Sequence, residues 1–348
     1  MFDKVTIQNF RGIRNAEIEG LHQINVFFGK NNCGKSSVLE AIFLLTGQSN
    51  PMLPIRVNGF RNYTRFAEND LRLDFYNLKS ENLIRLSATG ERDRDLEISM
   101  FREDNHSVEL NQVGKGATNA PEAVYGLKLS YTLNGNGIKY NSTVSVSQGD
   151  MSNGKIGLDS RYEEYLHAQY LPSAYMQIPI DEKFAKIVEN KQDKIILKIL
   201  NGIEPRIKNM TLVGKELMVD IGLDQLLPIN VMGDGLRKLL AIVLAVYECK
   251  DGILLVDEVD NGFHYTAMPL LWKAIFTAAD INHVQLFLST HNIDFLRGLV
   301  SYIKEEGEEM KKRISAYRLL RMDNDEIIPL DYDYMKLSYS LEQDIEVR

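Results

Sequence analysis

Apolar positions near the N-terminus predict a strand, a glycine-rich turn and a helix. Residues 1–7 alternate between apolar and polar side chains, and residues 24–28 form a continuous apolar run. Residues 35–45 then carry apolar side chains at helical spacing before Gly47, a common helix stop. Residues 1–47 therefore predict the order strand, loop, strand, turn and helix.

The middle of the chain has short alternating runs that are typical of antiparallel strands. Residues 71–75 and 127–131 are such runs, and the Asn/Gly-rich residues 134–137 are typical of a hairpin turn. Residues 182–200 carry apolar positions at helical spacing. We therefore expect an inserted β lobe followed by a helical region over residues 48–225.

Apolar strands alternate with helices in the last third of the chain. The pattern predicts, in order, a helix over 236–249, a strand over 253–256, a helix over 267–279 and a strand over 284–288. Continuous apolar strands separated by helices are typical of a parallel sheet that is buried on both faces. The predicted fold class is α/β, with residues 226–348 as a second lobe of one domain.

The segment between the second predicted strand and the first helix carries a phosphate-binding pattern. Residues 29–36 match GxxxxGK[ST] at every position. Glycines let the loop's N–H groups point at phosphates, Lys35 reaches the β- and γ-phosphates, and the Ser36 hydroxyl ligates Mg²⁺. A plain glycine-rich turn into a helix is the alternative, but the strand before and the helix after favour a phosphate loop. The predicted nucleotide-binding residues here are Gly29, Lys30, Asn31, Asn32, Cys33, Gly34, Lys35, Ser36 and Ser37.

Two acidic residues follow the apolar strand at residues 253–256. The carboxyl end of such a strand is where open α/β sheets bind ligands. Asp257 is expected to hold Mg²⁺ together with Ser36, and Glu258 to orient and deprotonate the attacking water. An ordinary core strand that ends in exposed carboxylates is the alternative.

A histidine ends the next apolar strand, in Ser289-Thr290-His291. At that place His291 can reach the γ-phosphate of a bound nucleotide, and its position after the two preceding motifs favours this role over that of an exposed bystander.

A second glycine-flanked helix start lies at residues 232–237. The helix N-terminus at Gly233, Asp234 and Gly235 is an anion site. Because the phosphates in the loop at 29–36 are already held, the economical use of this site is to bind the phosphates of a second molecule. The alternative is an ordinary N-cap, made by Asp234 or Asn230.

The order of these motifs resembles the ABC-ATPase heads of the SMC and RecF relatives. Residues 9–13, before the phosphate loop, are similar to the N-terminal strand of those heads. Residues 232–235 with Arg237, and residues 257–265, more closely resemble the ATPase half of OLD (overcoming lysogenisation defect) proteins, as does the segment 170–173. The resemblance spans nearly the whole chain.

This resemblance implies a RecA-like ABC-ATPase head with an inserted antiparallel β lobe and a helical segment. ATP and Mg²⁺ are the implied cofactors, and Lys35, Glu258 and His291 the catalytic residues. It also implies head-to-head assembly into a homodimer or a higher homo-oligomer. Asp234 departs from the doubly glycine signature of transporters, which argues against transport-type turnover.

The resemblance further implies a role in bacterial anti-phage defence, in a toxin-like system or in DNA maintenance. OLD proteins normally continue into a Toprim nuclease, but this chain has 57 residues after His291, so we expect an OLD-like ATPase without that domain. A separately encoded effector would then perform the output step.

Composition narrows these expectations. The chain has 348 residues, of which 44% are hydrophobic and 25% charged, as in ordinary globular proteins, and no apolar stretch is long enough to cross a membrane. Two cysteines, Cys33 and Cys249, provide neither a disulfide framework nor a four-cysteine zinc site, and no signal segment opens the chain. We expect a cytoplasmic protein.

Two alternatives from other classes stay open. The net charge of −8 disfavours indiscriminate coating of nucleic acid, but it leaves room for a local basic groove and hence for a RecF-like DNA-binding repair ATPase. The other alternative is a scaffold that binds ATP without turning it over, against which Glu258 argues.

Overall fold

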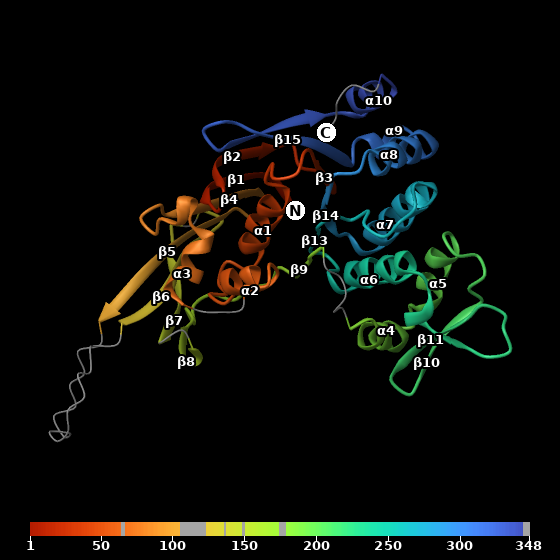
Figure 1. Ribbon diagram of the computed structural model, residues 1–348, viewed down its shortest axis with the longest axis horizontal. Helices are drawn as coiled ribbons and strands as arrows, with labels where there is room; N and C mark the ends of the chain where they lie inside the picture. The colour runs from red at the N-terminus through yellow and green to blue at the C-terminus, as the bar shows by residue number, and fades with distance from the viewer. Residues whose placement is uncertain (64–66, 105–122, 136, 148–149, 174–178, 344–348) are drawn as a thin grey trace.

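The computed structural model describes residues 1–63, 67–104, 123–135, 137–147, 150–173 and 179–343, and one large twisted sheet dominates it (Figure 1). Among these residues, thirteen strands join in the order β8-β7-β6-β5-β4-β1-β2-β16-β15-β3-β14-β13-β9. In chain order their bounds are β1 Phe2–Phe10, β2 Ile13–Glu19, β3 Ile24–Phe28, β4 Ile84–Gly90, β5 Arg94–Asp104, β6 Ala123–Leu133, β7 Tyr140–Ser147, β8 Asp150–Gly157, β9 Ala168–Leu171, β13 Ile253–Val256, β14 Gln285–Thr290, β15 Ile314–Arg321 and β16 Glu326–Tyr332.

The centre of the sheet is parallel. β9, β13, β14, β3 and β15 all run in the same direction, and Leu286 of β14 lies between Leu254 of β13 and Ile24 of β3. The side chains of β3, β13 and β14 are buried on both faces, which explains their continuous apolar runs. Both strands predicted at 253–256 and 284–288 are present, and the second one is shifted by a residue or two.

Helices cover both faces of this parallel centre (Figure 1). On one face α6 (Asp234–Glu248), α7 (Met268–Asn282) and α8 (Ile293–Glu306) pack against Val26 and Leu254. On the other face α1 (Lys35–Thr46) packs against Phe27 and Leu255. The alternation of side chains along each strand divides the core into these two clusters.

The predicted β lobe continues the same sheet rather than forming a separate one. β4 pairs antiparallel with β1, and β5, β6, β7 and β8 follow as an antiparallel series. Residues 127–131 lie in β6, as expected. In the predicted turn at 134–137, Asn136 lies outside the described residues.

The strand predicted at residues 71–75 is wrong. Leu71 ends α3 (Glu68–Leu71), and a 3₁₀ turn, η1 (Arg72–Asp74), follows. Leu71, Asp74 and Phe75 are the buried positions, which is a helical spacing of three and four residues. A buried aspartate thus gave the segment an alternating pattern that its packing does not have.

The helical pattern at 182–200 folds as two helices, α4 (Ile180–Glu189) and α5 (Asp193–Asn201). Lys191 has a φ of 58° and separates them. Both helices contribute to the core under α6, next to a small antiparallel sheet of β10 (Asn209–Val213), β11 (Glu216–Asp220) and β12 (Leu227–Pro228). No helix in the described part of the chain has the length and apolar character needed to span a membrane.

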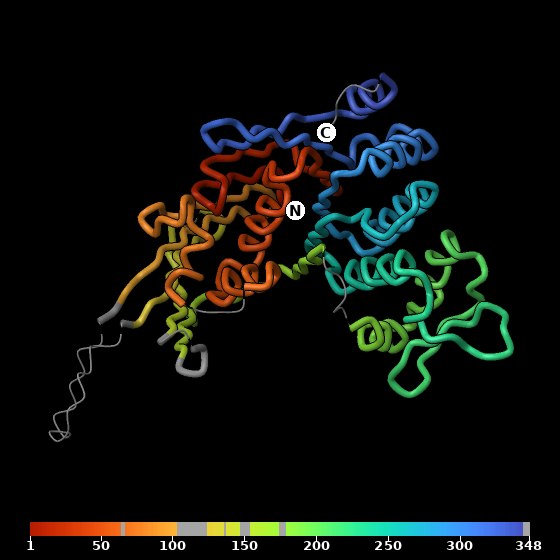
Figure 2. The backbone as a smooth tube through the Cα atoms, viewed as in Figure 1, coloured from red at the N-terminus to blue at the C-terminus, as the bar shows by residue number. Residues whose placement is uncertain are grey.

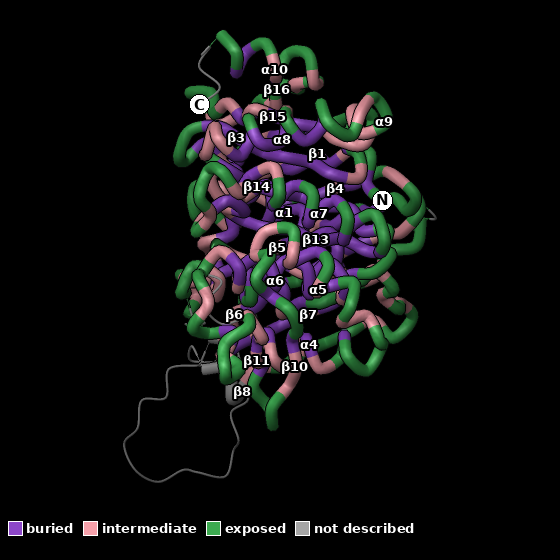
Figure 3. The backbone as a smooth tube through the Cα atoms, turned by 90° about the vertical axis from the view of Figure 1, so that its right-hand side faces the viewer, coloured by how far each residue is buried: buried purple, intermediate pink, exposed green. Residues whose placement is uncertain are grey.

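The N-terminal strands and the C-terminal hairpin lie side by side, as the red and blue segments of Figure 2 show. β16 pairs with β2 and β15 with β3, so the C-terminal hairpin lies between these two N-terminal strands. The buried residues, purple in Figure 3, include all of β3, β13 and β14. The remaining helical elements are α2 (Leu53–Gly59), α9 (Glu308–Lys311) and α10 (Tyr334–Glu342), with 3₁₀ turns η2 (Tyr76–Leu78), η4 (Ile229–Val231) and η5 (Tyr265–Ala267).

Candidate nucleotide-binding site

The loop that matches the phosphate-binding pattern joins β3 to α1 at the carboxyl end of the parallel strands. Gly29 has a φ of 140° and Gly34 a φ of 99°, conformations that residues with a side chain rarely adopt. A Cβ at Gly34 would also lie 2.3 Å from Cδ1 of Ile327. Asn32 is left-handed as well, with a φ of 64°. These conformations curl the loop, as phosphate binding requires.

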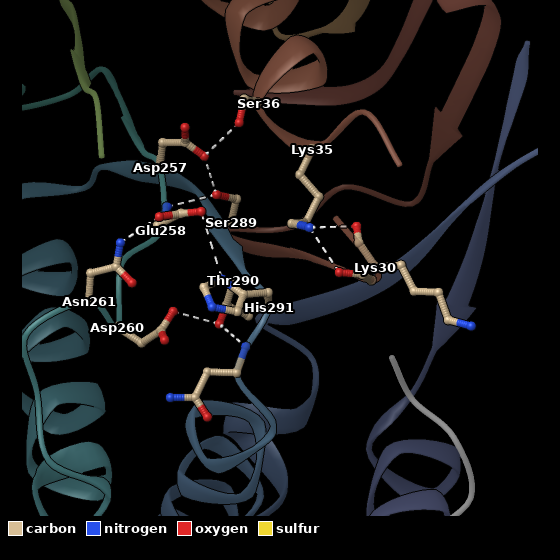
Figure 4. A network of polar contacts seen from close by, with 12 residues as sticks. Lys30, Lys35, Ser36, Asp257, Glu258, Asp260, Asn261, Ser289, Thr290 and His291 are labelled. Carbon is tan, nitrogen blue, oxygen red and sulfur yellow. Dashed lines mark hydrogen bonds and ion pairs between the residues drawn. The ribbon is translucent and has the colours of Figure 1, made fainter. Parts of the chain in front are cut away.

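Lys35 occupies the interior of that loop. Its Nζ donates to the carbonyl oxygens of Gly29 at 2.8 Å and Lys30 at 2.9 Å, and the side chain is 8% exposed. The buried ammonium therefore sits where the loop encloses it, at the start of α1 with its positive helix dipole. Lys30 points away from Lys35 and from Asp257 (Figure 4), so it does not share this interior position.

Asp257 lies next to the loop. The Ser36 hydroxyl donates to Asp257 Oδ1 at 3.2 Å, and the Ser289 hydroxyl donates to the same oxygen (Figure 4). Asp257 is 7% exposed, and its backbone N–H bonds the Leu171 carbonyl. The structure thus brings together the two predicted metal ligands, Ser36 and Asp257, from positions 221 residues apart.

Glu258 adopts a left-handed conformation, with a φ of 48°. Such a backbone is strained for a residue with a side chain, and strain of this kind concentrates at functional sites. The Ser289 hydroxyl accepts a hydrogen bond from the Glu258 N–H at 2.8 Å, and Asn261 donates to the Glu258 carboxylate. Nδ1 of His291 lies 3.8 Å from Glu258 Oε1. The predicted base and the strand-end histidine are therefore neighbours.

Several residues of this network were not assigned a role from the sequence. Ser289 bridges Asp257 and Glu258, and Thr290 donates to Asp260 at 2.6 Å. Lys238 of α6 donates to the carbonyl oxygens of Glu258 and Asn261, both at 2.8 Å. Burial lowers the pKa of Lys238 to about 8, against the opposing charge of Asp260, Glu258 and Asp257. The sequence did offer one signal for Ser289 and Thr290: they are polar residues at the end of an apolar strand.

The oxygen atoms around the loop are of the type that Mg²⁺ prefers. Mg²⁺ is usually bound through one or two protein groups together with phosphates and water. Ser36 and Asp257 form such a small set, and within the described residues no group of three or more His, Cys, Asp or Glu side chains is arranged to hold a metal ion. The residues present therefore fit a magnesium ion that is shared with a phosphate ligand.

The glycine-flanked helix start lies at the beginning of α6. Gly233 is its N-cap, with a φ of −59°, and Asp234 is 89% exposed. No side chain caps this helix start, so neither Asp234 nor Asn230 caps it. The nearest neighbours of a Cβ at Gly235 are the Gly262 carbonyl oxygen and the Phe263 ring. This segment thus faces the loop after Glu258 with one side and solvent with the other.

Residues 24–297, which include the phosphate loop, the glycine-flanked helix start, the acidic pair and His291, match the family model described as "AAA domain, putative AbiEii toxin, Type IV TA system". The chain belongs to this family. As a member of it, the protein is an ATPase of the AAA/ABC type.

Curated relatives extend the comparison beyond the family model. An "ATP/GTP phosphatase" of Helicobacter pylori is 27% identical over 99% of both chains. The DNA replication and repair protein RecF of Acinetobacter baumannii is 37% identical over 68 residues, which cover 19% of this chain and 18% of RecF.

Solved structures share the fold of this AAA-family ATPase at low sequence identity. An SMC head bound to the C-winged helix domain of ScpA aligns with a TM-score of 0.50 and 13% identity, over 97% of this chain and 99% of that one. An Smc head domain derived from Pyrococcus furiosus, bound to the C-terminal domain of ScpA, aligns with a TM-score of 0.50 and 11% identity, over 99% of both chains. The predicted ABC-ATPase head fold is confirmed.

Proposed function

We propose that this AAA-family chain binds and hydrolyses Mg-ATP as a switch between a monomer and a head-to-head homodimer. The observation that carries the proposal is the single polar network in which Ser36, Asp257, Glu258 and His291 meet at the phosphate loop (Figure 4). Three separate sequence motifs contribute to it: the phosphate loop, the acidic pair after β13 and the histidine at the end of β14. A core strand that merely ended in carboxylates would have no reason to meet the other two.

The phosphate loop is proposed to hold the triphosphate. Backbone N–H groups of residues 29–34 and the Lys35 ammonium supply positive potential, to which the α1 dipole adds. Ser36 and Asp257 would hold Mg²⁺, which neutralises charge on the β- and γ-phosphates. Gly29 to Ser37 form the cis half of the site in this proposal.

Glu258 is proposed to orient and deprotonate the attacking water. Its carboxylate is partly exposed and held by Asn261, and its backbone is left-handed. His291, 3.8 Å away, is proposed to contact the γ-phosphate and to sense its presence. General-base catalysis of this kind contributes about 10²- to 10⁴-fold in rate.

The second half of the site is proposed to come from another copy of the chain. Gly233 and Asp234 are exposed at the start of a 15-residue helix, whose N-terminus attracts anions. Gly235 packs on Gly262 and Phe263 of its own chain. In this proposal residues 226–348 act as the second lobe of one domain, with residues 48–225 inserted before them.

The output is proposed to pass through a separately encoded effector, in an anti-phage or toxin-like system. The family description, which includes a putative toxin of a toxin–antitoxin system, supports this role, as does the resemblance to OLD ATPases. ATP can bias such a partner only through different affinities for the two states of the switch. A cytoplasmic location, where ATP is available, agrees with two buried free cysteines.

RecF-like DNA maintenance is the alternative, favoured by the local match to RecF. It predicts DNA affinity that appears only with ATP and falls steeply with salt.

Glu258→Gln tests the proposal. Phosphate release should slow by about 10²- to 10⁴-fold, while light scattering at saturating Mg-ATP should show a dimer that persists. Glu305→Gln, which removes an exposed carboxylate from α8, is the matched control and should behave as wild type. A Glu258→Gln variant that stays monomeric with ATP bound would refute the two-copy site, and unchanged phosphate release would refute the role of Glu258.

A further inference from the structure

A pocket borders the phosphate loop on the side away from Asp257. It has a volume of about 340 Å³ and is lined by residues 30–33 of the loop and by residues 318–321 at the end of β15. β3, which leads into the loop, lies between β14 and β15 and is parallel to both. Asp257 lies beyond β14, whereas the pocket lies against β15. The two are therefore on opposite sides of the loop.

A nucleoside triphosphate in the loop has two ends, and this geometry orients it. The function proposed above puts the terminal phosphate beside Ser36 and Asp257, so the nucleoside must leave the loop on the β15 side. Resting on that proposed function, we infer that the pocket takes the ribose and purine base of the nucleotide, with the Arg321 guanidinium stacked on the base.

The Arg321 guanidinium is already held in one orientation. Asp325 accepts hydrogen bonds from Arg321 Nε at 3.0 Å and Nη2 at 2.6 Å, and the Tyr76 hydroxyl donates to the other oxygen of Asp325 at 3.0 Å. Arg321 Nη1 lies 3.5 Å from the carbonyl oxygen of Asn32 in the loop. A planar cation fixed in this way, with its side chain 38% exposed, can stack on a base at little cost in conformational entropy.

Gly12 provides the space for this guanidinium. A Cβ at Gly12 would lie 3.0 Å from Arg321 Nη2 and 3.2 Å from Nη1. Gly12 belongs to the segment 9–13, which resembles the N-terminal strand of SMC and RecF heads but has no part in the phosphate network. Its contact with Arg321 gives this segment a role beside the nucleotide.

Stacking on a guanidinium does not depend on the exocyclic groups of the base. Each base has a π-face, so contacts of this kind tolerate different bases. In the pocket, base recognition through Arg321 therefore predicts similar affinity for ATP and GTP.

Calorimetric titration of the full chain with Mg-ATP, Mg-GTP and inorganic triphosphate tests the inference. Arg321→Ala should weaken both nucleotides about tenfold and leave triphosphate binding unchanged. Gly12→Ala, which displaces the guanidinium but keeps its charge, should weaken the nucleotides in the same direction. Arg206→Ala is the matched control, because Arg206 also pairs with a nearby carboxylate, Glu204, on the separate small-sheet region, and it should change nothing. Circular dichroism verifies each fold.

The outcomes separate this inference from the proposed function. Unchanged nucleotide affinity in both Arg321→Ala and Gly12→Ala, with triphosphate binding lost in Lys35→Ala, would overturn the nucleoside pocket and leave the phosphate loop intact. Weakened triphosphate binding in Arg321→Ala would make Arg321 a phosphate ligand and also overturn it. A preference for ATP over GTP of more than about tenfold would contradict base-tolerant stacking. A wild-type chain that binds neither nucleotides nor triphosphate would refute the proposed function itself.

Discussion

Ser289 connects the two acidic residues at the end of β13, and its removal is a direct test of the candidate site. The fully buried hydroxyl donates to Asp257 and accepts from the Glu258 N–H at 2.8 Å. Ser289→Ala removes both bonds without changing the size of the side chain much. The Glu258 N–H then lacks its acceptor, and Asp257 loses one of its donors.

The size of the effect follows from these two bonds. A buried polar group left without its partner costs about 1–3 kcal/mol, so we expect the free energy of unfolding to fall by about 2–4 kcal/mol. Glu258 also loses a contact that fixes its strained backbone. Because a shift of about 1 Å in a catalytic group costs roughly 10²-fold in rate, kcat should fall by about 10- to 100-fold. KM for ATP should change little, since Lys35 and the loop are untouched.

Ser315→Ala is the matched control for this prediction. Ser315 is 4% exposed, and its hydroxyl donates to the Gly20 carbonyl at 2.7 Å and lies 2.6 Å from His22 Nδ1, at the opposite end of the sheet. Urea unfolding should show a similar loss of stability in both variants. Steady-state phosphate release should fall only in Ser289→Ala. Equal rates in the two variants would show that the Ser289 bonds do not support hydrolysis.

Two further predictions concern dimerisation and pH. Gly233→Glu should bind ATP but remain monomeric in light scattering. Gly233 is a better position for this test than Gly235, because a Cβ at Gly233 meets nothing within 4 Å, whereas a Cβ at Gly235 would lie 3.0 Å from the Gly262 carbonyl oxygen. An ATP-dependent dimer of Gly233→Glu would contradict the two-copy site. Burial raises the pKa of Asp74 from 3.8 to about 7, against the opposing charge of Arg11. Between about pH 4 and 7 the folded chain therefore binds the Asp74 proton more tightly than the unfolded chain does. As a consequence, the free energy of unfolding falls as the pH rises through this range. Asp74→Asn should flatten that slope in urea unfolding measured across this window, and an unchanged slope would be the contrary result.

Much of the fold was predictable because its signals are local. The strand at residues 24–28, the loop at 29–36 and the helices α6 and α7 each follow from periodicity or from a short motif. The order of motifs also indicated that Asp257 and Ser36 would meet, since parallel strands end at one edge of a sheet.

The contacts that complete the site were not predictable from local patterns. Ser289 lies 32 residues from Asp257 along the chain, and Arg321 lies 289 residues from Asn32. Lys238 was part of an ordinary helical pattern, and only the fold shows that its ammonium reaches the Glu258 carbonyl. Tertiary packing also overrode the alternating pattern at residues 71–75.

The shape of the phosphate loop itself depends on the distant C-terminal hairpin. A Cβ at Gly29 would lie 2.9 Å from the Leu319 carbonyl oxygen in β15, and one at Gly34 would lie 2.3 Å from Ile327 in β16. The two glycines are therefore required by packing against this hairpin as well as by their positive φ. Since β15 pairs with β3 and β16 with β2, the hairpin is fixed in the sheet along both of its edges. The motif GxxxxGK[ST] thus gives a phosphate-binding geometry here because residues almost three hundred positions away hold it in place.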